Sequence, residues 1–250
     1  MKRGYRFVAC ALILALVLPQ AAFAQSAEGF GQNVRIKLSI GDRTSFKFTP
    51  VGEFTLLEDS GVKVGTEELT VKAVGGRVSI EFANKTVTAP SLTLKSAHYG
   101  ERTDYIRLRN SEHGTCTYLG DITFDVVEGS LRAINTLPME QYLYGVVPNE
   151  MSNSFPIDAL KAQAVAARTY TLYKLISGGN HGDTADICTD STCCQAYISQ
   201  EAARTNWGEQ ADALEAKIRT AVADTDGETI LYGGVPILAV FHSSSAGLTR

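Results

Sequence analysis

Short runs in which apolar and polar residues strictly alternate, between residues 33 and about 127, constrain this chain most. An alternating run places every second side chain on one face of a β-strand. Gly, Asp and Asn separate the runs, as expected for an antiparallel arrangement. The clearest runs are residues 34–38, 45–49, 53–57, 78–82 and 105–109. We therefore expect a β-rich region over residues 33–129.

The pattern changes after Gly129. Residues 131–147 predict a strand, a turn and a short helix. A long Ala-rich helix is predicted from Ser154, whose side chain is expected to cap it, to about Ile176, with Gly178 and Gly179 ending it. One face of this helix is expected to pack against another element, through Ile157, Leu160, Ala164, Ala167 and Thr171.

A second helix is expected over about residues 208–223, followed by paired strands at 229–232 and 237–241. The predicted fold class is thus α+β: a β-rich N-terminal part plus a mixed α/β part with a long Ala-rich helix, and a cleft between them. The mixed part covers residues 130–250. Because the chain ends in a loop after Phe241, we expect it to be truncated at its C-terminus.

The first 24 residues have the composition of a targeting segment. Lys2, Arg3 and Arg6 precede an almost wholly apolar stretch over residues 7–19, and an Ala-Phe-Ala sequence ends at residue 24. These features predict a cleaved secretory signal, with an uncleaved membrane anchor as the alternative. Residues 25–32 are small and polar, as in a linker. The rest of the chain is expected to be exported and extracytoplasmic, in the cell wall or at the outer face of the membrane.

The charge balance limits the partners. The chain has 27 acidic residues and 23 basic ones, and three of the basic ones lie in the predicted signal. An acidic body argues against nucleic acid as the main partner.

Three motifs in the second half carry a family resemblance. Residues 137–151 read Leu-Pro-Met-Glu-Gln-Tyr-Leu-Tyr-Gly-Val-Val-Pro-Asn-Glu-Met, and residues 159–170 read Ala-Leu-Lys-Ala-Gln-Ala-Val-Ala-Ala-Arg-Thr-Tyr. Residues 241–249 read Phe-His-Ser-Ser-Ser-Ala-Gly-Leu-Thr. Over about residues 130–250 the chain resembles the stage II sporulation protein D family and its relatives, the amidase enhancers.

The resemblance implies a lytic transglycosylase that cuts peptidoglycan glycan strands in sporulation or wall remodelling. It assigns the catalytic acid to Glu150, expected in a loop just before a helix. It associates Lys161 and Arg168 with activity or glycan binding, and Ser244 belongs to the last motif. Where the family more often has Gly-Gly-Arg-Thr, this chain has Ala-Gly-Leu-Thr at residues 246–249, so a basic residue is missing.

Other side chains in this region have two interpretations. Gln163, Tyr170 and Tyr197 are candidates for contact with sugar, but core packing or loop hydrogen bonds explain them equally well. Glu140 is a second acid in the first motif, and we expect a structural role for it. Lys161 and Arg168 lie seven residues apart on one helix face, where a solvated surface is the alternative.

One carboxyl group is enough for the implied reaction. Hydrolytic glycosidases usually use two. In a lytic transglycosylase the C6 hydroxyl of muramic acid attacks its own C1, so that one group first donates a proton and later accepts one. General acid–base catalysis of this kind contributes typically about 10²–10⁴-fold.

A loop after the long helix contains His181, Cys188, Cys193 and Cys194 within fourteen residues. Tetrahedral zinc accepts such nitrogen and sulfur ligands. The resemblance also implies structural zinc, because some family members bind it in this loop through two Cys and two His. The alternative for an exported chain is a Cys188–Cys194 disulfide, with Cys193 free or paired to Cys116.

The expected partners are peptidoglycan glycan strands denuded of stem peptides, together with a cell-wall amidase and other wall-remodelling proteins. Two other functions remain open at this point. The chain is alternatively a non-catalytic wall-binding module that enhances an N-acetylmuramoyl-L-alanine amidase. A weaker alternative is a zinc amidase that uses His181 and the cysteines.

Overall fold

The structure is a computed structural model, and it describes residues 33–59, 61–82, 84–99, 102–110, 114–179 and 181–242. The predicted signal and linker lie outside these residues. In the described part of the chain, no helix has both the length and the apolar character that crossing a membrane requires.

Two larger β-sheets account for most of the described strands. The first has the order β13-β1-β12-β11-β8-β3-β4 and the second β10-β9-β2-β5-β6-β7. The strands up to residue 96 are β1 (Asn33–Lys37), β2 (Ser45–Val51), β3 (Phe54–Leu56), β4 (Val62–Val64), β5 (Leu69–Val74), β6 (Arg77–Phe82), β7 (Lys85–Ala89) and β8 (Ser91–Ser96). The later ones are β9 (Tyr105–Asn110), β10 (Gly114–Leu119), β11 (Asp121–Val127), β12 (Ser130–Pro138) and β13 (Ile187–Cys188).

The two sheets pack face to face, because alternation turns one apolar face of each toward the other. Phe46 and Phe48 of β2 meet Phe124 of β11, with both pairs of ring centroids 5.4 Å apart. The strands pair antiparallel except for β13, which lies parallel to β1. The predicted β-rich N-terminal part and the α+β fold class are therefore confirmed.

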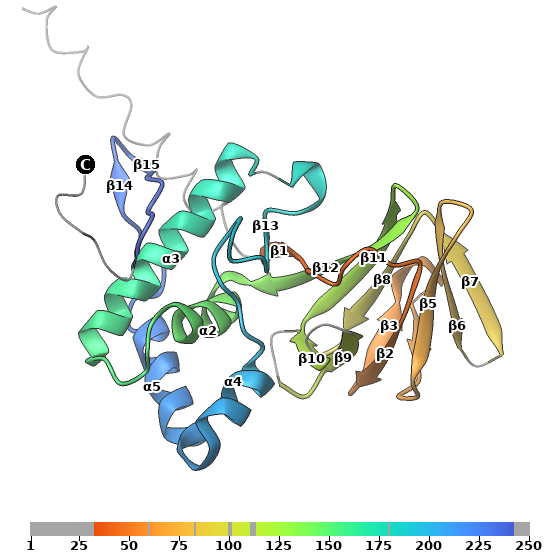
Figure 1. Ribbon diagram of the computed structural model, residues 1–250, viewed down its shortest axis with the longest axis horizontal. Coiled ribbons are helices and arrows are strands. Elements are labelled where there is room, and N and C mark those ends of the chain that lie inside the picture. The colour runs from red at the N-terminus through yellow and green to blue at the C-terminus, as the bar shows by residue number, and fades with distance from the viewer. Residues whose placement is uncertain are drawn as a thin grey trace, which may run out of the picture. The chain divides into compact units, whose positions relative to one another are not determined.

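The helices follow directly on β12. They are α2 (Met139–Glu150), α3 (Ile157–Ser177), α4 (Gln200–Trp207) and α5 (Ala211–Ala223), and a short hairpin of β14 (Leu231–Tyr232) and β15 (Val235–Pro236) follows them. Single 3₁₀ turns are η1 (Leu57–Asp59), η2 (Gly182–Thr184) and η3 (Gly208–Gln210). Helix α2 contacts α3, α4 and α5, and α3 packs along α5 (Figure 1).

The long Ala-rich helix forms as predicted, with a different start. Leu160, Ala164, Ala167 and Thr171 are fully buried, as expected for its packed face. The predicted Ser154 cap is wrong, because α3 begins after Pro156 and has no side-chain cap. Proline fits there since the first helical turns need no amide donor from it.

Two other boundaries also differ from the sequence prediction. The helix expected over 208–223 is preceded by α4, which ends at Trp207, and Gly208, with φ 54°, caps α4 and begins η3. The strand expected at 237–241 is not formed; β15 ends at Pro236. A positive φ favours glycine, so Gly208 suits the break between the two helices. A single glycine in a polar stretch does not by itself predict that a helix lies on each side of it.

A buried carboxylate fixes the loop that joins β8 to β9. Asp104 is 1% exposed, and it accepts hydrogen bonds from the backbone N–H groups of Glu53 (3.0 Å) and His98 (2.8 Å) and from the Ser96 hydroxyl (3.0 Å). Burial alone would raise the pKa of Asp104, but these hydrogen bonds outweigh it and hold the pKa below its usual value. The charged form therefore stabilises the fold.

Replacing this carboxylate by an amide is expected to destabilise the protein in a pH-dependent way. Asp104→Asn should lower the free energy of unfolding by about 1.5–3 kcal/mol at pH 7, since it removes charge-assisted acceptors. Because the folded-state pKa is depressed, the difference from the native protein should shrink as pH falls below about 4. Urea denaturation at pH 7 and pH 3 measures this, with the exposed Asp42→Asn as control. A pH-independent loss would contradict it.

Candidate functional site

Glu150 is the last residue of α2, not a loop residue before a helix, so that part of the prediction is wrong. Its Oε1 accepts a hydrogen bond of 2.6 Å from the backbone N–H of Ala196. Among the described residues, no ion pair and no other hydrogen bond reaches its carboxylate. The side chain is thus oriented by one backbone donor, and its second oxygen has no described partner.

The segment that holds Glu150 runs along α2. The Ile198 N–H donates to the carbonyl of Gly145 at 3.1 Å. The ring of Tyr197 stacks on Tyr142, with centroids 5.7 Å apart and planes 5° from parallel. Gly145 permits this approach, because a Cβ there would lie 2.6 Å from the Ile198 carbonyl oxygen. We call residues 195–198 the clamp segment.

A buried glutamine fastens the clamp segment to two helices. Gln195 is 3% exposed, and its Oε1 accepts hydrogen bonds from the hydroxyls of Thr171 (2.9 Å) and Tyr142 (3.4 Å). Its Nε2 donates to the Ala167 carbonyl at 3.4 Å. Because both the oxygen and the nitrogen of the buried Gln195 side chain have partners, the side chain holds the backbone of Gln195 in place. It therefore also positions the next backbone N–H, that of Ala196, which binds Glu150.

Sequence analysis missed both Gln195 and Ala196. The contact from Ala196 comes from its backbone, so its side chain carries no signal for the role. Gln195 lies directly after the cysteine pair, and that position next to a candidate metal site was the one signal available.

The structure places the two predicted glycan-binding cations in different environments. Arg168 is 3% exposed; its guanidinium donates to both carboxylate oxygens of Glu140 (2.8 and 2.7 Å) and to the carbonyls of Val222 and Glu228. These contacts tie α3 to α2 and to the segment after α5, and they agree with the structural role expected for Glu140. A glycan contact by Arg168 stays a prediction.

Lys161 lies nearer the surface of the same helix. Its Nζ pairs with Asp224 at 2.8 Å, and this hydrogen-bonded partner raises the pKa of the ammonium group. Lys161 remains charged and partly exposed, and its contact with a glycan also stays a prediction.

The remaining predicted sugar contacts differ in accessibility. Gln163 is 6% exposed, and its Nε2 has no hydrogen-bond partner among the described residues. Tyr197 lines a cavity of about 460 Å³, while burial raises the pKa of its hydroxyl. Ser244 lies outside the described residues.

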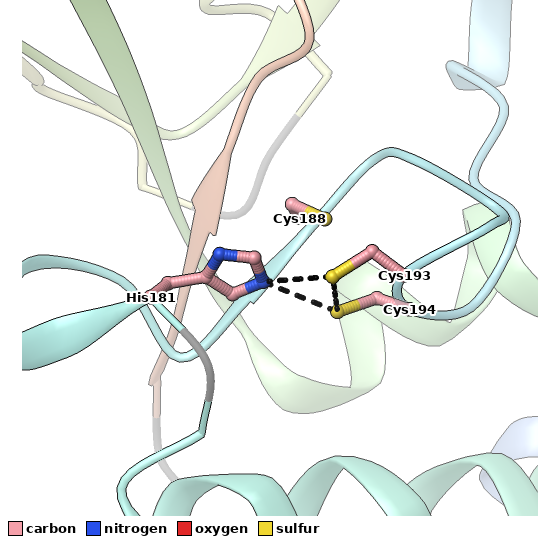
Figure 2. Close-up of side chains that lie close together, drawn as sticks. All are labelled: His181, Cys188, Cys193 and Cys194. Atoms are coloured by element: carbon pink, nitrogen blue, oxygen red, sulfur yellow. Dashed lines mark hydrogen bonds between the residues drawn. The ribbon is translucent and has the colours of Figure 1, made fainter.

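The four predicted metal ligands lie together. Figure 2 shows the His181 ring pointing at the sulfur atoms of Cys193 and Cys194, with Cys188 beside them. His181 Nε2 is 3.3 Å from Cys194 Sγ and 3.6 Å from Cys193 Sγ, and the two sulfur atoms are 3.9 Å apart. All four ligand atoms lie within 4.8 Å of one another.

This arrangement fits tetrahedral zinc. With Zn–S of ~2.3 Å and Zn–N of ~2.0–2.1 Å, the ligand atoms of a tetrahedral site lie about 3.5–3.8 Å apart. Burial raises the pKa of the Cys188 thiol to about 12, so that binding of a metal there releases protons. The alternative Cys188–Cys194 disulfide is not present, because Cys116, Cys188, Cys193 and Cys194 are all free.

Together these observations define an α+β protein with one carboxylate fixed at a helix end and a His–Cys cluster directly before the clamp segment that holds it. Residues 127–232 match the family model of the stage II sporulation protein, SpoIID. Over 130 residues, 52% of this chain, the sequence is 33% identical to stage II sporulation protein D of Bacillus subtilis (strain 168) and to that of Bacillus amyloliquefaciens. Over 108 residues, 43% of this chain, it is 35% identical to an amidase enhancer of Bacillus subtilis (strain 168).

The match of residues 127–232 to this family model confirms the resemblance to the SpoIID family read from the motifs. The match covers 38% of the length of the two stage II sporulation proteins D and 12% of the amidase enhancer. Glu150 and the metal cluster both lie inside the matched residues.

Gly145→Ala is expected to displace the clamp segment, because the added Cβ meets the Tyr197 ring and the Ile198 carbonyl. Overpacking of this kind costs about 1–3 kcal/mol. Thermal unfolding should show the loss, and hydrogen exchange should show faster exchange of the Ala196 amide. Ala202→Gly, on the neighbouring helix α4, is the control for a general effect of exchanging glycine and alanine within a helix. Unchanged exchange at Ala196 would show that Gly145 does not govern the clamp.

Proposed function

We propose that this chain is an exported peptidoglycan lytic transglycosylase that cleaves the bond between N-acetylmuramic acid and N-acetylglucosamine. The match of residues 127–232 to the SpoIID family model and the likeness to an amidase enhancer support a role related to the cell wall. The observation that carries the finer proposal is the Glu150 carboxylate, held by one backbone amide and otherwise without a described partner.

The reaction needs one group that both gives and takes a proton. Protonated Glu150 donates its proton to the glycosidic oxygen as the bond from that oxygen to C1 of muramic acid breaks. The C6 hydroxyl of the same sugar then bonds to C1 and gives its proton to the Glu150 carboxylate. The products are a shortened strand and a 1,6-anhydro end, and the enzyme is restored. Because the nucleophile is part of the substrate, no second carboxyl is needed.

The clamp segment contributes orientation to this reaction. The Ala196 amide fixes one oxygen of Glu150, which leaves the other as the oxygen for proton transfer. Packing of Tyr197 on Tyr142 and the buried Gln195 hold that amide in place. A proton donor that is already in position spares the cost of ordering it in the transition state.

His181, Cys188, Cys193 and Cys194 would hold a structural zinc ion. A closed set of four ligands supplies cross-linking of the loop and leaves no coordination position for a water nucleophile. For this reason a zinc amidase is a weaker candidate function than a transglycosylase. The ligands Cys193 and Cys194 come directly before Gln195, so the metal would anchor the clamp segment from its N-terminal side.

The likeness to an amidase enhancer favours a second candidate function, a non-catalytic wall-binding module that acts with an amidase. This candidate needs no proton donor. It therefore predicts that Glu150 can be replaced without loss of function.

Glu150→Gln separates the two candidates. On denuded glycan strands we expect the native protein to release fragments one water lighter than hydrolysis products, and the variant to be about 10²–10⁴-fold slower. Mass spectrometry of the fragments measures both. The amide keeps the shape and can still accept from Ala196, so the fold should be preserved.

The matched control for this test is Glu209→Gln, an exposed glutamate in η3. It should release anhydro fragments at the native rate. Full activity of Glu150→Gln, or no cleavage by the native protein together with stimulation of an amidase, would favour the wall-binding module.

Metal analysis tests the zinc site. Protein purified under reducing conditions is expected to contain about one zinc ion per chain. Cys194→Ser should lose most of it and unfold at a lower temperature, because the loop loses the ion that cross-links it. Cys116→Ser, which lies outside the cluster, should retain the metal. Well under one zinc per native chain would reject the site.

A further inference from the structure

A cavity of about 460 Å³ lies between β9–β10 and α4, apart from Glu150. Its volume is within the range of small-ligand sites. One wall comes from Arg102, Tyr105, Thr117 and Leu119, which lie outside the family match, and the other from residues between 197 and 211, inside it. The charged, hydroxyl-bearing and aromatic side chains that line it include Arg102, Tyr105, Thr117, Tyr197, Glu201 and Arg204.

Behind this cavity lies a cluster with excess positive charge. Glu215, which is 9% exposed, accepts hydrogen bonds from Arg102 (2.7 Å), Arg219 (2.9 Å) and Arg204. Arg204 also pairs with the exposed Asp212 at 2.6 Å. Two carboxylates thus face three guanidinium groups, and the cluster keeps a net positive charge.

Arg102 and Arg204 both line the cavity, and each has N–H groups that no described residue engages. A guanidinium has five N–H groups. Contacts with described residues engage Nη1 of Arg102, and Nη1 and Nη2 of Arg204. Glu215 fixes both side chains, so their remaining N–H groups are held in a preset arrangement. Such paired guanidinium groups match the planar shape of a carboxylate.

Glu201 limits which anion fits. Its carboxylate lines the same cavity and accepts a hydrogen bond from the Thr117 hydroxyl of β10, which ties α4 to the sheet. A second negative charge on a ligand would be repelled by it. The cavity therefore favours a single carboxylate over a phosphate dianion.

Tyr105 and Tyr197 give the cavity its apolar surface. A tyrosine ring supplies a large contact area for the C–H faces of a sugar or for an aliphatic side chain. Tyr197 belongs to the clamp segment, one residue after the Ala196 amide that holds Glu150. A ligand in the cavity would therefore lie next to the segment that orients the carboxylate.

We propose that this cavity is a second binding site, which takes a carboxylate-bearing unit of peptidoglycan with its carboxylate on Arg102 and Arg204. The assignment to peptidoglycan rests on the proposed function. Two units supply the chemistry: the lactyl carboxylate of N-acetylmuramic acid and the carboxylates of the stem peptide.

The fluorescence of Trp207 reports on binding, since it is the single tryptophan of the chain and lies on α4 three residues after Arg204. We would titrate the full chain with N-acetylmuramic acid, with its methyl ester and with the dipeptide N-acetyl-D-Ala-D-Ala, which has a single stem-peptide carboxylate, and repeat the titrations by calorimetry. Saturable binding of N-acetylmuramic acid but not of its ester identifies the lactyl carboxylate. Binding of the dipeptide alone identifies the stem peptide. Either result supports the site.

Two variants are expected to change the binding affinity in opposite directions, so that misfolding cannot explain both results. Arg102→Gln should weaken binding about tenfold or more, because it removes a charge-assisted donor. Glu201→Gln should tighten binding about two- to fivefold, since it removes a repulsive charge and keeps an acceptor for Thr117. Arg109→Gln, an exposed residue of β9 outside the cavity, should leave affinity unchanged.

The proposal is overturned if neither acid binds, if the ester binds as tightly as the acid, or if Arg102→Gln and Glu201→Gln leave affinity unchanged. Equal binding of inorganic phosphate also overturns it, because the site would then not select a carboxylate. None of these titrations involves cleavage. Anhydro products without binding would refute the second site alone, and binding without anhydro products would refute the transglycosylase alone.

Discussion

The orientation of Glu150 depends on one hydrogen bond, which its carboxylate accepts from the backbone N–H of Ala196. Several elements of the structure act together to hold that amide in place. A backbone amide can orient a carboxylate only if the chain on both sides of it is immobile. Here Gln195 is buried between α2 and α3, and Tyr197 is stacked on Tyr142 of α2. Gly145 has no side chain at the point where the two segments approach most closely. The carboxylate is therefore positioned by packing of a loop against a helix, and the chemistry follows from that packing.

The same loop is attached to the β-sheet at its other end. Its strand β13 pairs parallel with β1, and the largely buried Asp186 forms an ion pair with Arg35 at 2.6 Å. Of the His–Cys cluster, His181 comes before β13, Cys188 belongs to β13, and Cys193 and Cys194 come directly before the clamp segment. A bound zinc ion would thus connect the part of the loop that the sheet fixes to the part that holds Glu150. Such an ion would have a mechanical role, which a closed set of four ligands suits.

Sequence reasoning succeeded where a local pattern carries the information. Alternation predicted the β-rich half, and the spacing of Leu160, Ala164 and Ala167 predicted the buried face of α3. The close spacing of His181 and the three cysteines along the chain also predicted correctly that they lie together. Lys161 and Arg168 share a helix face but not an environment, because Glu140 of α2 pairs with the buried Arg168 whereas Asp224 pairs with the more exposed Lys161. What covers each position of a helix is decided by its neighbours in space.

The sequence by itself determined the fold class, the resemblance to the SpoIID family and the identity of the candidate acid and metal ligands, since each depends on residue type and spacing along the chain. Only the tertiary structure decided which group orients Glu150, that Arg168 is buried, and that β9–β10 and α4 enclose a cavity backed by arginines. These features join residues far apart in the chain, through backbone groups and buried charges. Their positions follow from how the sheets and helices pack, which no local pattern encodes.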